Sequence, residues 1–403
     1  MFSRYAPVCG LAMALVALGW PAGPGRAEPP PVKTSTARPL YPVGVDVRAF
    51  VDPARPDWRT RGPRPLATVI WYPAPDGTDM GALPLSDSTV RYFGDAQGAP
   101  LFKPIPVAFG AKLAAGPRRP LILLSHGSTG LGLSLEWLAH ALAERGYIVA
   151  AVNHHGNTIA EGTLLPQGFG LPWERADDLS AVLTDLLHDP VFGPAIDPHR
   201  IGAAGHSAGG ETVIAMAGGR FNRPLLMSYC ASAASQGDGT CEPRDAIRQS
   251  IADIDALAHK DAAVSASLQR SHASHKDARV RAVFAMAPAM GPAFEPADLK
   301  DVDIPVAIVV GDADDTAPAK SNAARFAGQI RGAKLSVLHD VGHLTFSSEC
   351  SALGMARLDG CRDLPGIDRA AVQRAVADQA YAFFESAWPH PKDKPLAGRR
   401  RAN

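Results

Sequence analysis

A serine between glycines is the strongest chemical motif in this chain. Residues 205–210 read GHSAGG, directly after the apolar segment 200–204 and before a segment of helical character. A G-x-S-x-G sequence where a strand meets a helix holds its serine on a tight turn with the hydroxyl exposed. A plain glycine turn into a helix is the alternative. The context of the motif therefore makes Ser207 a candidate nucleophile.

A serine hydroxyl needs a base to accept its proton, and the base needs a carboxylate to fix its tautomer. In the fold that places its serine on such a strand-to-helix turn, the partners follow the serine in the order acid, then histidine. Three histidines lie beyond the predicted strand 306–310, namely His339, His343 and His390. We select His343, because it lies on a glycine-containing turn from which its ring can reach back over the sheet. His339 is interpreted as a surface or packing residue.

The acid is expected just after the strand 306–310, where residues 311–318 read GDADDTAP. Three carboxylates so close together cannot share one buried site, because like charges raise each other's pKa. Asp314 ranks first, followed by Asp312 and then Asp315. The carboxylates that are not used cap the next helix or face water.

A tetrahedral intermediate also needs two N–H donors for its oxyanion. Ala208, directly after the serine, is one candidate, and Ser128 in the segment SHGSTG (125–130) is the other. A plain glycine turn is the alternative for that segment. The residues expected to contact substrate are Gly127, His206 and His155.

A metal or cofactor is not expected. The adjacent histidines 154 and 155 suggest a metal site, but neighbours on a strand point to opposite faces. The GHSAGG segment has the wrong spacing for a dinucleotide fingerprint or a phosphate-binding loop.

The elements around these motifs alternate between short apolar strands and amphipathic helices. This alternation predicts an α/β fold whose mainly parallel sheet carries helices on both faces. Residues 73–117 are rich in glycine and proline and predict loop, and residues 220–278 predict an insertion or cap over the sheet edge. The predicted strands are 43–51, 66–71, 120–125, 147–152, 200–204, 280–286, 306–310 and 334–338, and the predicted helices are 135–145, 173–187, 318–330 and 367–388.

The N-terminal segment has the features of a secretory signal. Arg4 precedes an apolar stretch at 8–20, and residues 25–27 resemble a cleavage site, so cleavage is expected after Ala27. About 13 apolar residues fall short of the roughly 20 that a membrane anchor needs. We expect a signal peptide at 1–27, a disordered lead-in at 28–40, a catalytic domain at 41–390 and a basic tail at 391–403, in a periplasmic or secreted protein.

Four cysteines follow the signal segment in two local pairs. Cys230 and Cys241, and likewise Cys350 and Cys361, are eleven positions apart in loops rich in glycine and serine. In an exported protein this pattern predicts two disulfides. A zinc site is the alternative, but the spacings match no common zinc pattern.

Composition narrows the class of protein further. The 403 residues are 46% hydrophobic and 20% charged, with 40 basic and 40 acidic side chains. These values exclude collagen-like, coiled-coil and largely disordered chains. The zero net charge gives no electrostatic reason to expect a nucleic acid or an anionic membrane as partner. The oligomeric state is left open.

Together the motifs HGSTG (126–130), GHSAGG (205–210), GDADDTAP (311–318) and DVGH (340–343) resemble the α/β-hydrolase superfamily. The finer pattern is similar to bacterial predicted dienelactone hydrolases and platelet-activating-factor acetylhydrolase-like esterases. Further matches within residues 41–388 are ATVIWYP (67–73), NHHGN (153–157), RADDL (175–179) and RVRAV (279–283).

The resemblance implies a metal-free serine esterase for small esters with short acyl groups or otherwise accessible ester bonds. Two positions depart from it, since Ser207 replaces the cysteine of dienelactone hydrolases and Ala208 replaces the bulky aromatic of many relatives. A peptidase or amidase, a polyester hydrolase and a catalytically silent binding protein of the same fold are the alternatives.

Overall fold

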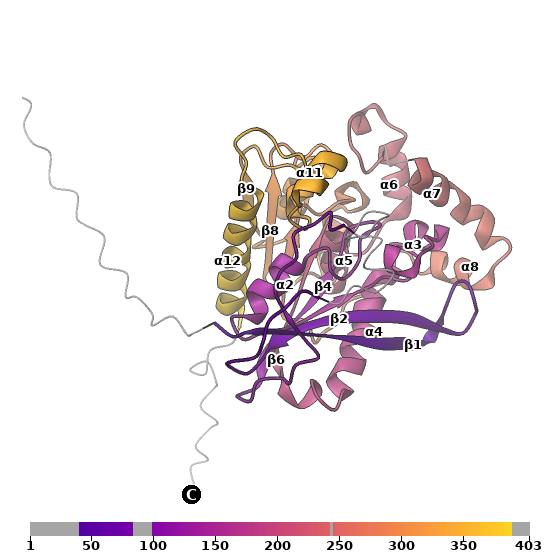
Figure 1. The fold of residues 1–403 in the computed structure, drawn as a ribbon. Coiled ribbons are helices and arrows are strands. Elements are labelled where there is room, and N and C mark those ends of the chain that lie inside the picture. The colour runs from indigo at the N-terminus through magenta and orange to yellow at the C-terminus, as the bar shows by residue number, and fades with distance from the viewer. Residues whose placement is uncertain (1–39, 84–98, 242–244, 389–403) are drawn as a thin grey trace, which may run out of the picture. The chain divides into compact units, whose positions relative to one another are not determined.

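The computed structural model describes residues 40–83, 99–241 and 245–388 (Figure 1). The expected signal peptide, the basic tail and His390 lie outside these residues, as does the expected lead-in apart from Leu40. The compact unit to which the described residues belong begins at Leu40.

A nine-stranded sheet organises the described residues, with strand order β3-β1-β2-β5-β4-β6-β7-β8-β9. Strands β1 and β2 pair antiparallel, as do β2 and β5, and all other neighbours pair parallel. The predicted, mainly parallel sheet is thus confirmed. The strands are β1 (Val43–Pro56), β2 (Pro63–Pro73), β3 (Ala108–Phe109), β4 (Arg119–Ser125), β5 (Ile148–Val152), β6 (Ile196–His206), β7 (Ala282–Met286), β8 (Val306–Gly311) and β9 (Lys334–Leu338).

The central strands are apolar on both faces because helices cover both faces. Every residue of β4, β5, β7 and β8 is buried. Two glycines of β6 identify the covering helices, since they are three residues apart on the strand and so face opposite ways. A Cβ at Gly202 would lie 2.7 Å from Phe384 of α12 (Arg369–Ala387), and one at Gly205 would lie 2.2 Å from the Gly209 carbonyl oxygen in α5 (Ala208–Ala217).

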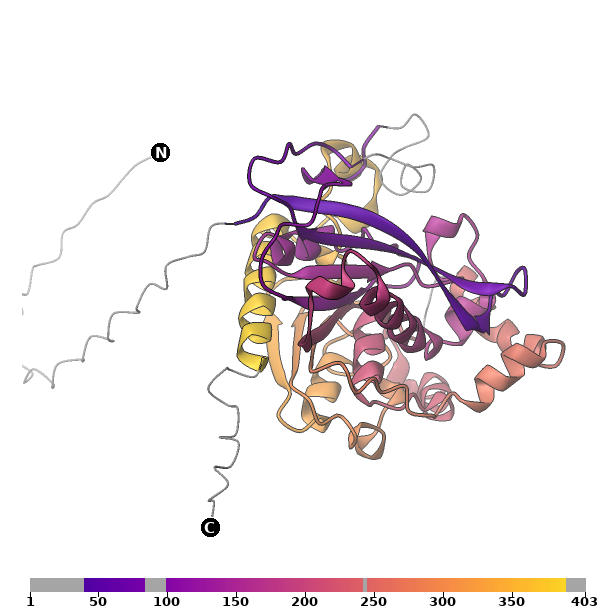
Figure 2. The ribbon, with the colours of Figure 1, turned by 90° about the horizontal axis from the view of Figure 1, so that it is seen from below.

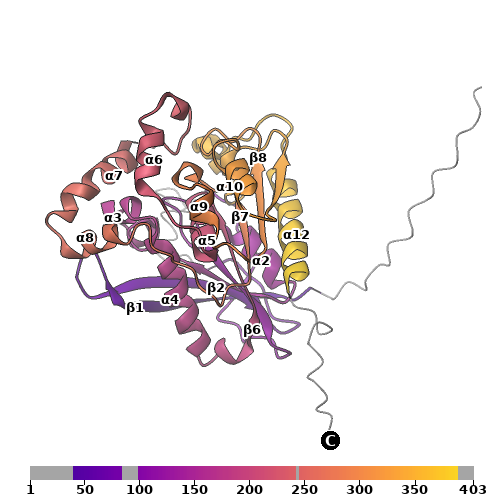
Figure 3. The same ribbon diagram turned by 180° about the vertical axis from the view of Figure 1, so that it is seen from behind.

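Other helices complete the two layers. Helix α2 (Glu136–Ala143) contacts α12, and α4 (Glu174–His188) contacts α5. Figures 1 and 3 show α12 running beside the β8–β9 end of the sheet. Three short helices lie in the second half of the chain: α9 (Pro296–Leu299), α10 (Ala323–Gln329) and α11 (Ala352–Arg357).

Residues 220–278, the expected insertion, contain α6 (Arg223–Cys230), α7 (Asp245–Ala258) and α8 (Ala262–Gln269). These helices gather beside α3 (Pro166–Gly170), a helix that the sequence did not predict (Figures 1 and 3). Helix α7 packs closely on α3: a Cβ at Gly170 of α3 would lie only 2.7 Å from Ile254 of α7. The long β1–β2 ribbon, indigo in Figure 2, also reaches the insertion, where Arg61 pairs with Asp261 at 2.7 Å.

Both expected disulfides are present, joining Cys230 to Cys241 and Cys350 to Cys361. Among the residues that the structure describes, no helix has the length and apolarity needed to cross a membrane.

Candidate active site

Ser207 lies on a strained turn between β6 and α5. Its φ of 58° and ψ of −121° are unfavourable for a residue with a side chain. The turn is possible because glycines lie two residues before and two residues after Ser207: a Cβ at Gly205 would lie 2.2 Å from the Gly209 carbonyl oxygen, and one at Gly209 would lie 2.0 Å from the Ser125 carbonyl oxygen. The N–H of Ser207 donates to the Met286 carbonyl oxygen at 3.0 Å, which fixes the turn against β7.

His343 begins a short 3₁₀ helix, His343–Phe346, that follows β9. Its Nε2 lies 2.9 Å from Oγ of Ser207, and only 5% of the residue is exposed. Trp137 of α2 donates its Nε1–H to the Phe346 carbonyl oxygen at 2.9 Å, and Gln373 of α12 donates to the carbonyl oxygens of Thr345 and Ser347. The turn that carries His343 is therefore held from two helices.

Asp314 follows β8 and faces the other ring nitrogen of His343, with Oδ2 2.7 Å from Nδ1. Its Oδ1 accepts hydrogen bonds from the N–H groups of Thr316 at 3.1 Å and Ala317 at 2.7 Å. A carboxylate accepts, so Nδ1 of His343 carries the proton and Nε2 is free to accept the Ser207 hydroxyl proton. The contacts thus join Ser207, His343 and Asp314 in one hydrogen-bonded chain.

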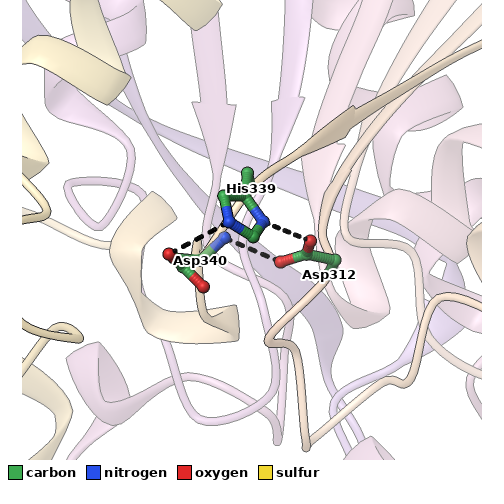
Figure 4. A group of neighbouring side chains, drawn as sticks. All are labelled: Asp312, His339 and Asp340. Atoms are coloured by element: carbon green, nitrogen blue, oxygen red, sulfur yellow. Dashed lines mark hydrogen bonds and ion pairs between the residues drawn. The ribbon is translucent and has the colours of Figure 1, made fainter. Parts of the chain in front are cut away.

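The other candidates within the described residues, Asp312, Asp315 and His339, are exposed. Figure 4 shows Asp312 and His339 together with Asp340. Oδ2 of Asp312 is 2.9 Å from Nδ1 of His339, a side chain that is 84% exposed, and the opposite ring nitrogen is 3.3 Å from Asp340. The bond to Asp312 raises the pKa of His339. Asp315 is also exposed and accepts a bond from the Thr316 hydroxyl at 3.3 Å. These groups pair with one another and not with Ser207.

The two oxyanion candidates lie on either side of the serine. Ala208 is the first residue of α5, where backbone N–H groups lack partners within the helix. Ser128 is exposed in the loop after β4, and a Cβ at the adjacent Gly127 would lie 3.2 Å from Cβ of Ser207. The N–H of Thr129 is already bonded to Oδ1 of Asn157 at 2.8 Å. The N–H groups of Ser128 and Gly127 are therefore the candidate oxyanion donors of this loop.

Two of the expected substrate contacts, His206 and His155, make hydrogen bonds within the protein. His206 is buried, its Nε2 donates to the His343 carbonyl oxygen at 3.0 Å, and its ring centroid lies 4.7 Å from that of His343. Burial and the neighbouring His343 hold the pKa of His206 well below its usual value. His155 accepts the Trp58 N–H at 3.0 Å and meets Glu161 at 2.7 Å. Both side chains are thus buried among protein groups, and their contact with substrate stays a prediction.

The first disulfide loop rests on the segment that carries Asp314. A Cβ at Gly239 would lie 2.5 Å from the carbonyl oxygen of Thr316. Asp238 is buried in the same loop and accepts the Ser321 hydroxyl at 2.6 Å. The loop 230–241 therefore braces the segment that carries Asp314.

The second disulfide loop rests on the turn that carries His343. A Cβ at Gly360 would lie 2.8 Å from Leu344, and Asp363 accepts the Thr345 hydroxyl at 2.7 Å. Arg369 joins Asp363 at 2.8 Å and donates to the Gly360 carbonyl oxygen at 2.8 Å. The loop 350–361 and the residues after it therefore brace the turn that carries His343.

A second Ser–His–Asp chain, which sequence reasoning missed, lies beneath the loop after β4. Oγ of Ser125 is 2.8 Å from Nε2 of His154, and Nδ1 of His154 is 3.0 Å from Asp178. All three residues have an exposed fraction of 0%. The motifs NHHGN and RADDL contain two of them, but nothing in those strings indicates that they meet. Without access to substrate, this chain is structural.

Comparisons with known proteins agree with this architecture. Residues 121–353 match the sequence profile described as "Alpha/beta hydrolase family". A ferulic acid esterase from Streptomyces cinnamoneus has a similar structure, with a TM-score of 0.56 and 21% sequence identity, over 91% of this chain and 96% of that one. At this identity the likeness shows a shared fold.

One curated relative is similar in sequence over a short segment. Lipase 1 of Moraxella sp. (strain TA144) is 33% identical over 94 residues, which are 23% of this chain. The match spans about a quarter of that relative's length (26%).

Proposed function

Because this chain belongs to the alpha/beta hydrolase family, we propose that it hydrolyses carboxylic esters through an acyl-enzyme on Ser207. The observation that carries the proposal is the continuous hydrogen-bonded chain from Ser207 through His343 to Asp314. The strained turn supports it, since it projects the Ser207 hydroxyl from the end of β6 towards His343.

The proposed reaction has two halves. In the first, Oγ of Ser207 attacks the ester carbonyl carbon while its proton passes to Nε2 of His343, and the Asp314 carboxylate stabilises the resulting imidazolium. The N–H groups of Ala208 and Ser128 bind the oxyanion. The intermediate collapses when His343 protonates the departing alcohol, which leaves the acyl group on Ser207.

In the second half, His343 removes a proton from water, and the hydroxide attacks the acyl carbon. Collapse of this intermediate releases the carboxylic acid and returns the proton to Ser207. No step requires a metal or an organic cofactor, because the side chains and backbone supply the nucleophile, the base and the oxyanion donors.

For the substrate we propose small esters with short acyl groups or accessible ester bonds. The resemblance to platelet-activating-factor acetylhydrolase-like esterases supports this class, and a lipase and a ferulic acid esterase among the similar proteins support ester bonds in general. We further propose that the protein is exported to the periplasm or beyond the cell, where its two disulfides are stable.

The test is turnover of p-nitrophenyl esters of increasing chain length by the wild type and by Ser207→Ala. We expect Ser207→Ala to lose at least about 10³-fold in kcat and to lose labelling by a fluorophosphonate probe. Ser274→Ala, at an exposed serine, is the matched control. Near-normal turnover by Ser207→Ala refutes the proposal. Faster turnover of a matched anilide than of the ester would identify an amidase, and an unlabelled wild type would indicate a binding protein.

A further inference from the structure

We propose that Arg175 and His126 are positioning residues that aim the backbone N–H groups of the oxyanion loop, residues 126–130, at the reaction centre. The inference rests on the proposed function, because it concerns how the same site stabilises its intermediate. Neither side chain need touch the substrate. Each acts by holding one carbonyl oxygen of the loop.

Arg175 joins the loop to the helix that begins at the nucleophile. It extends from α4 with an exposed fraction of 2%. Its Nη2 donates to the carbonyl oxygen of His126 and, at 3.3 Å, to Oγ of Ser125. Its Nε donates at 3.1 Å to the Thr212 hydroxyl, which in turn donates at 2.8 Å to the Ala208 carbonyl oxygen. One guanidinium thus connects both segments that carry oxyanion donors.

The His126 ring holds the next carbonyl. Its Nε2 accepts the N–H of His154 at 3.2 Å, so that nitrogen carries no proton. The proton is therefore on Nδ1, which donates to the Gly127 carbonyl oxygen at 2.7 Å. Burial and the nearby charge of Arg175 hold the pKa of His126 well below its usual value, so the ring stays neutral and keeps this tautomer.

These two bonds orient the peptide groups of the loop, together with the bond from the Gly130 N–H to the Gly127 carbonyl oxygen at 3.1 Å. In a trans peptide the C=O and N–H groups point in opposite directions, and the described residues contain no cis peptide. Arg175 draws the His126 carbonyl into the interior, which turns the N–H of Gly127 outwards. His126 draws the Gly127 carbonyl towards its own ring, which turns the N–H of Ser128 away from that ring. The loop lies against Ser207, as the close approach of Gly127 shows.

The loop can be held rigidly because its support is buried and anchored at several points. Ser125 donates to His154, which donates to Asp178. Asp178 in turn accepts from Arg64 of β2 and Arg55 of β1, each at 2.7 Å. Burial and the charge of Arg175 lower the pKa of His154 to about 3, so this chain keeps one pattern of donors and acceptors across the working pH range.

The test uses two substitutions at position 126, each of which keeps only one of the two hydrogen bonds that the His126 ring makes. His126→Asn retains a donor near the position of Nδ1, and His126→Gln retains an acceptor near the position of Nε2. Loss of a single oxyanion donor costs about 10²–10³-fold in kcat, and a misdirected donor should cost part of that. We expect His126→Gln to lower kcat by about 30-fold or more with little change in KM, while His126→Asn stays within about fivefold of the wild type.

Affinity for a transition-state analogue provides the readout that a merely structural role would not move. A trifluoromethyl ketone, which forms a tetrahedral adduct with the serine, should lose affinity for His126→Gln by the same factor as kcat/KM. A substrate-like amide should bind both variants as it binds the wild type. Thermal unfolding identifies any variant that fails to fold.

Arg175→Lys is the second arm, and it decides the question if His126→Gln does not fold. Lysine keeps the positive charge but not the planar fork that reaches both Thr212 and the loop. We expect lower kcat and weaker analogue binding, with KM nearly unchanged. Equal losses in His126→Asn and His126→Gln, or wild-type kcat in either His126→Gln or Arg175→Lys, overturn the inference. That result leaves the proposed function intact, because the latter depends on Ser207→Ala and on probe labelling.

Discussion

Nε2 of His154 lies 2.8 Å from Oγ of Ser125, which is nearly the distance that separates His343 from Ser207, 2.9 Å. Each histidine also contacts an aspartate through Nδ1. The two chains differ in access, because Ser125 and His154 are completely buried whereas Ser207 is partly exposed on its turn. Hydrogen-bond geometry alone therefore does not identify a nucleophile, and exposure separates the candidate from its buried counterpart.

Asp314 and Asp312, which both follow β8, differ sharply in their expected effect on catalysis. Asp314→Asn keeps the shape of the side chain but turns an acceptor of the Nδ1 proton into a group that can donate. The histidine then takes the wrong tautomer, and kcat should fall by about 10³–10⁴-fold. Asp312→Asn, at the exposed pair with His339, should stay within about twofold of the wild type. Steady-state turnover of a p-nitrophenyl ester compares them, and equal losses would contradict the assignment of the acid.

Removing either disulfide should destabilise the protein, because the unfolded chain gains conformational entropy when the cross-link is lost. Closing a loop of this length stabilises a fold by about 3 kcal/mol. We expect Cys230→Ser/Cys241→Ser and Cys350→Ser/Cys361→Ser each to lose about that much in chemical denaturation. The second pair should also lower kcat, because Gly360 packs on Leu344 beside the catalytic base. Unchanged stability and unchanged kinetics in both variants would refute the bracing role.

Glu211 makes the stability of the protein depend on pH. Neither carboxylate oxygen has a hydrogen-bond partner within the described residues, and burial raises the pKa of Glu211 from 4.5 to about 7, with Arg175 and His275 opposing the rise. The folded protein therefore holds a proton that the unfolded chain releases between pH 4.5 and 7. Stability falls across that window, by on the order of 3 kcal/mol when complete.

Glu211→Gln removes this titration. The variant should gain stability relative to the wild type as the pH rises from 4.5 to 8, with the difference in free energy of unfolding levelling off above about pH 7. Denaturant unfolding of both proteins at pH 4.5, 6 and 8 measures the difference. A difference that is the same at all three values would show that Glu211 does not titrate in the folded state.

Local patterns in the sequence predicted most of the sheet, because a continuous apolar run within one segment is enough to identify a buried strand. The apolar runs at 120–125 and 147–152 became β4 and β5 almost residue for residue. The helix expected at 318–330 forms only at Ala323–Gln329, since the first residues complete the turn that follows Asp314. The helix α3 was missed because PQGFG has glycines that weaken a helical pattern.

The candidate site could be reached from the sequence because its chemistry restricts the choices. The order of the three groups along the chain and the turn after β9 singled out His343, and the structure joins that residue to Asp314 and Ser207. The buried roles of His155 and His206 could not be found in this way. Trp58 and the His343 backbone, which bond to these two rings, are distant in sequence and carry no motif, and the nearby partner Glu161 carries none either.

The buried ion pairs were the hardest feature to foresee, and they lead to the last prediction. Asp178 has an exposed fraction of 0% and accepts bonds from Arg64, 114 residues away, and from Arg55. Asp178→Asn leaves the buried Arg64 guanidinium without a carboxylate partner among the described residues, whereas Arg55 keeps its bonds to Asp52 and Glu174. The unpaired charge of Arg64 should cost about 3–5 kcal/mol of unfolding free energy. Asp303→Asn is the control, since its exposed bond to Lys276 should contribute nothing measurable. Equal unfolding midpoints for the two variants would mean that water replaces the lost carboxylate and that the arginines do not depend on it.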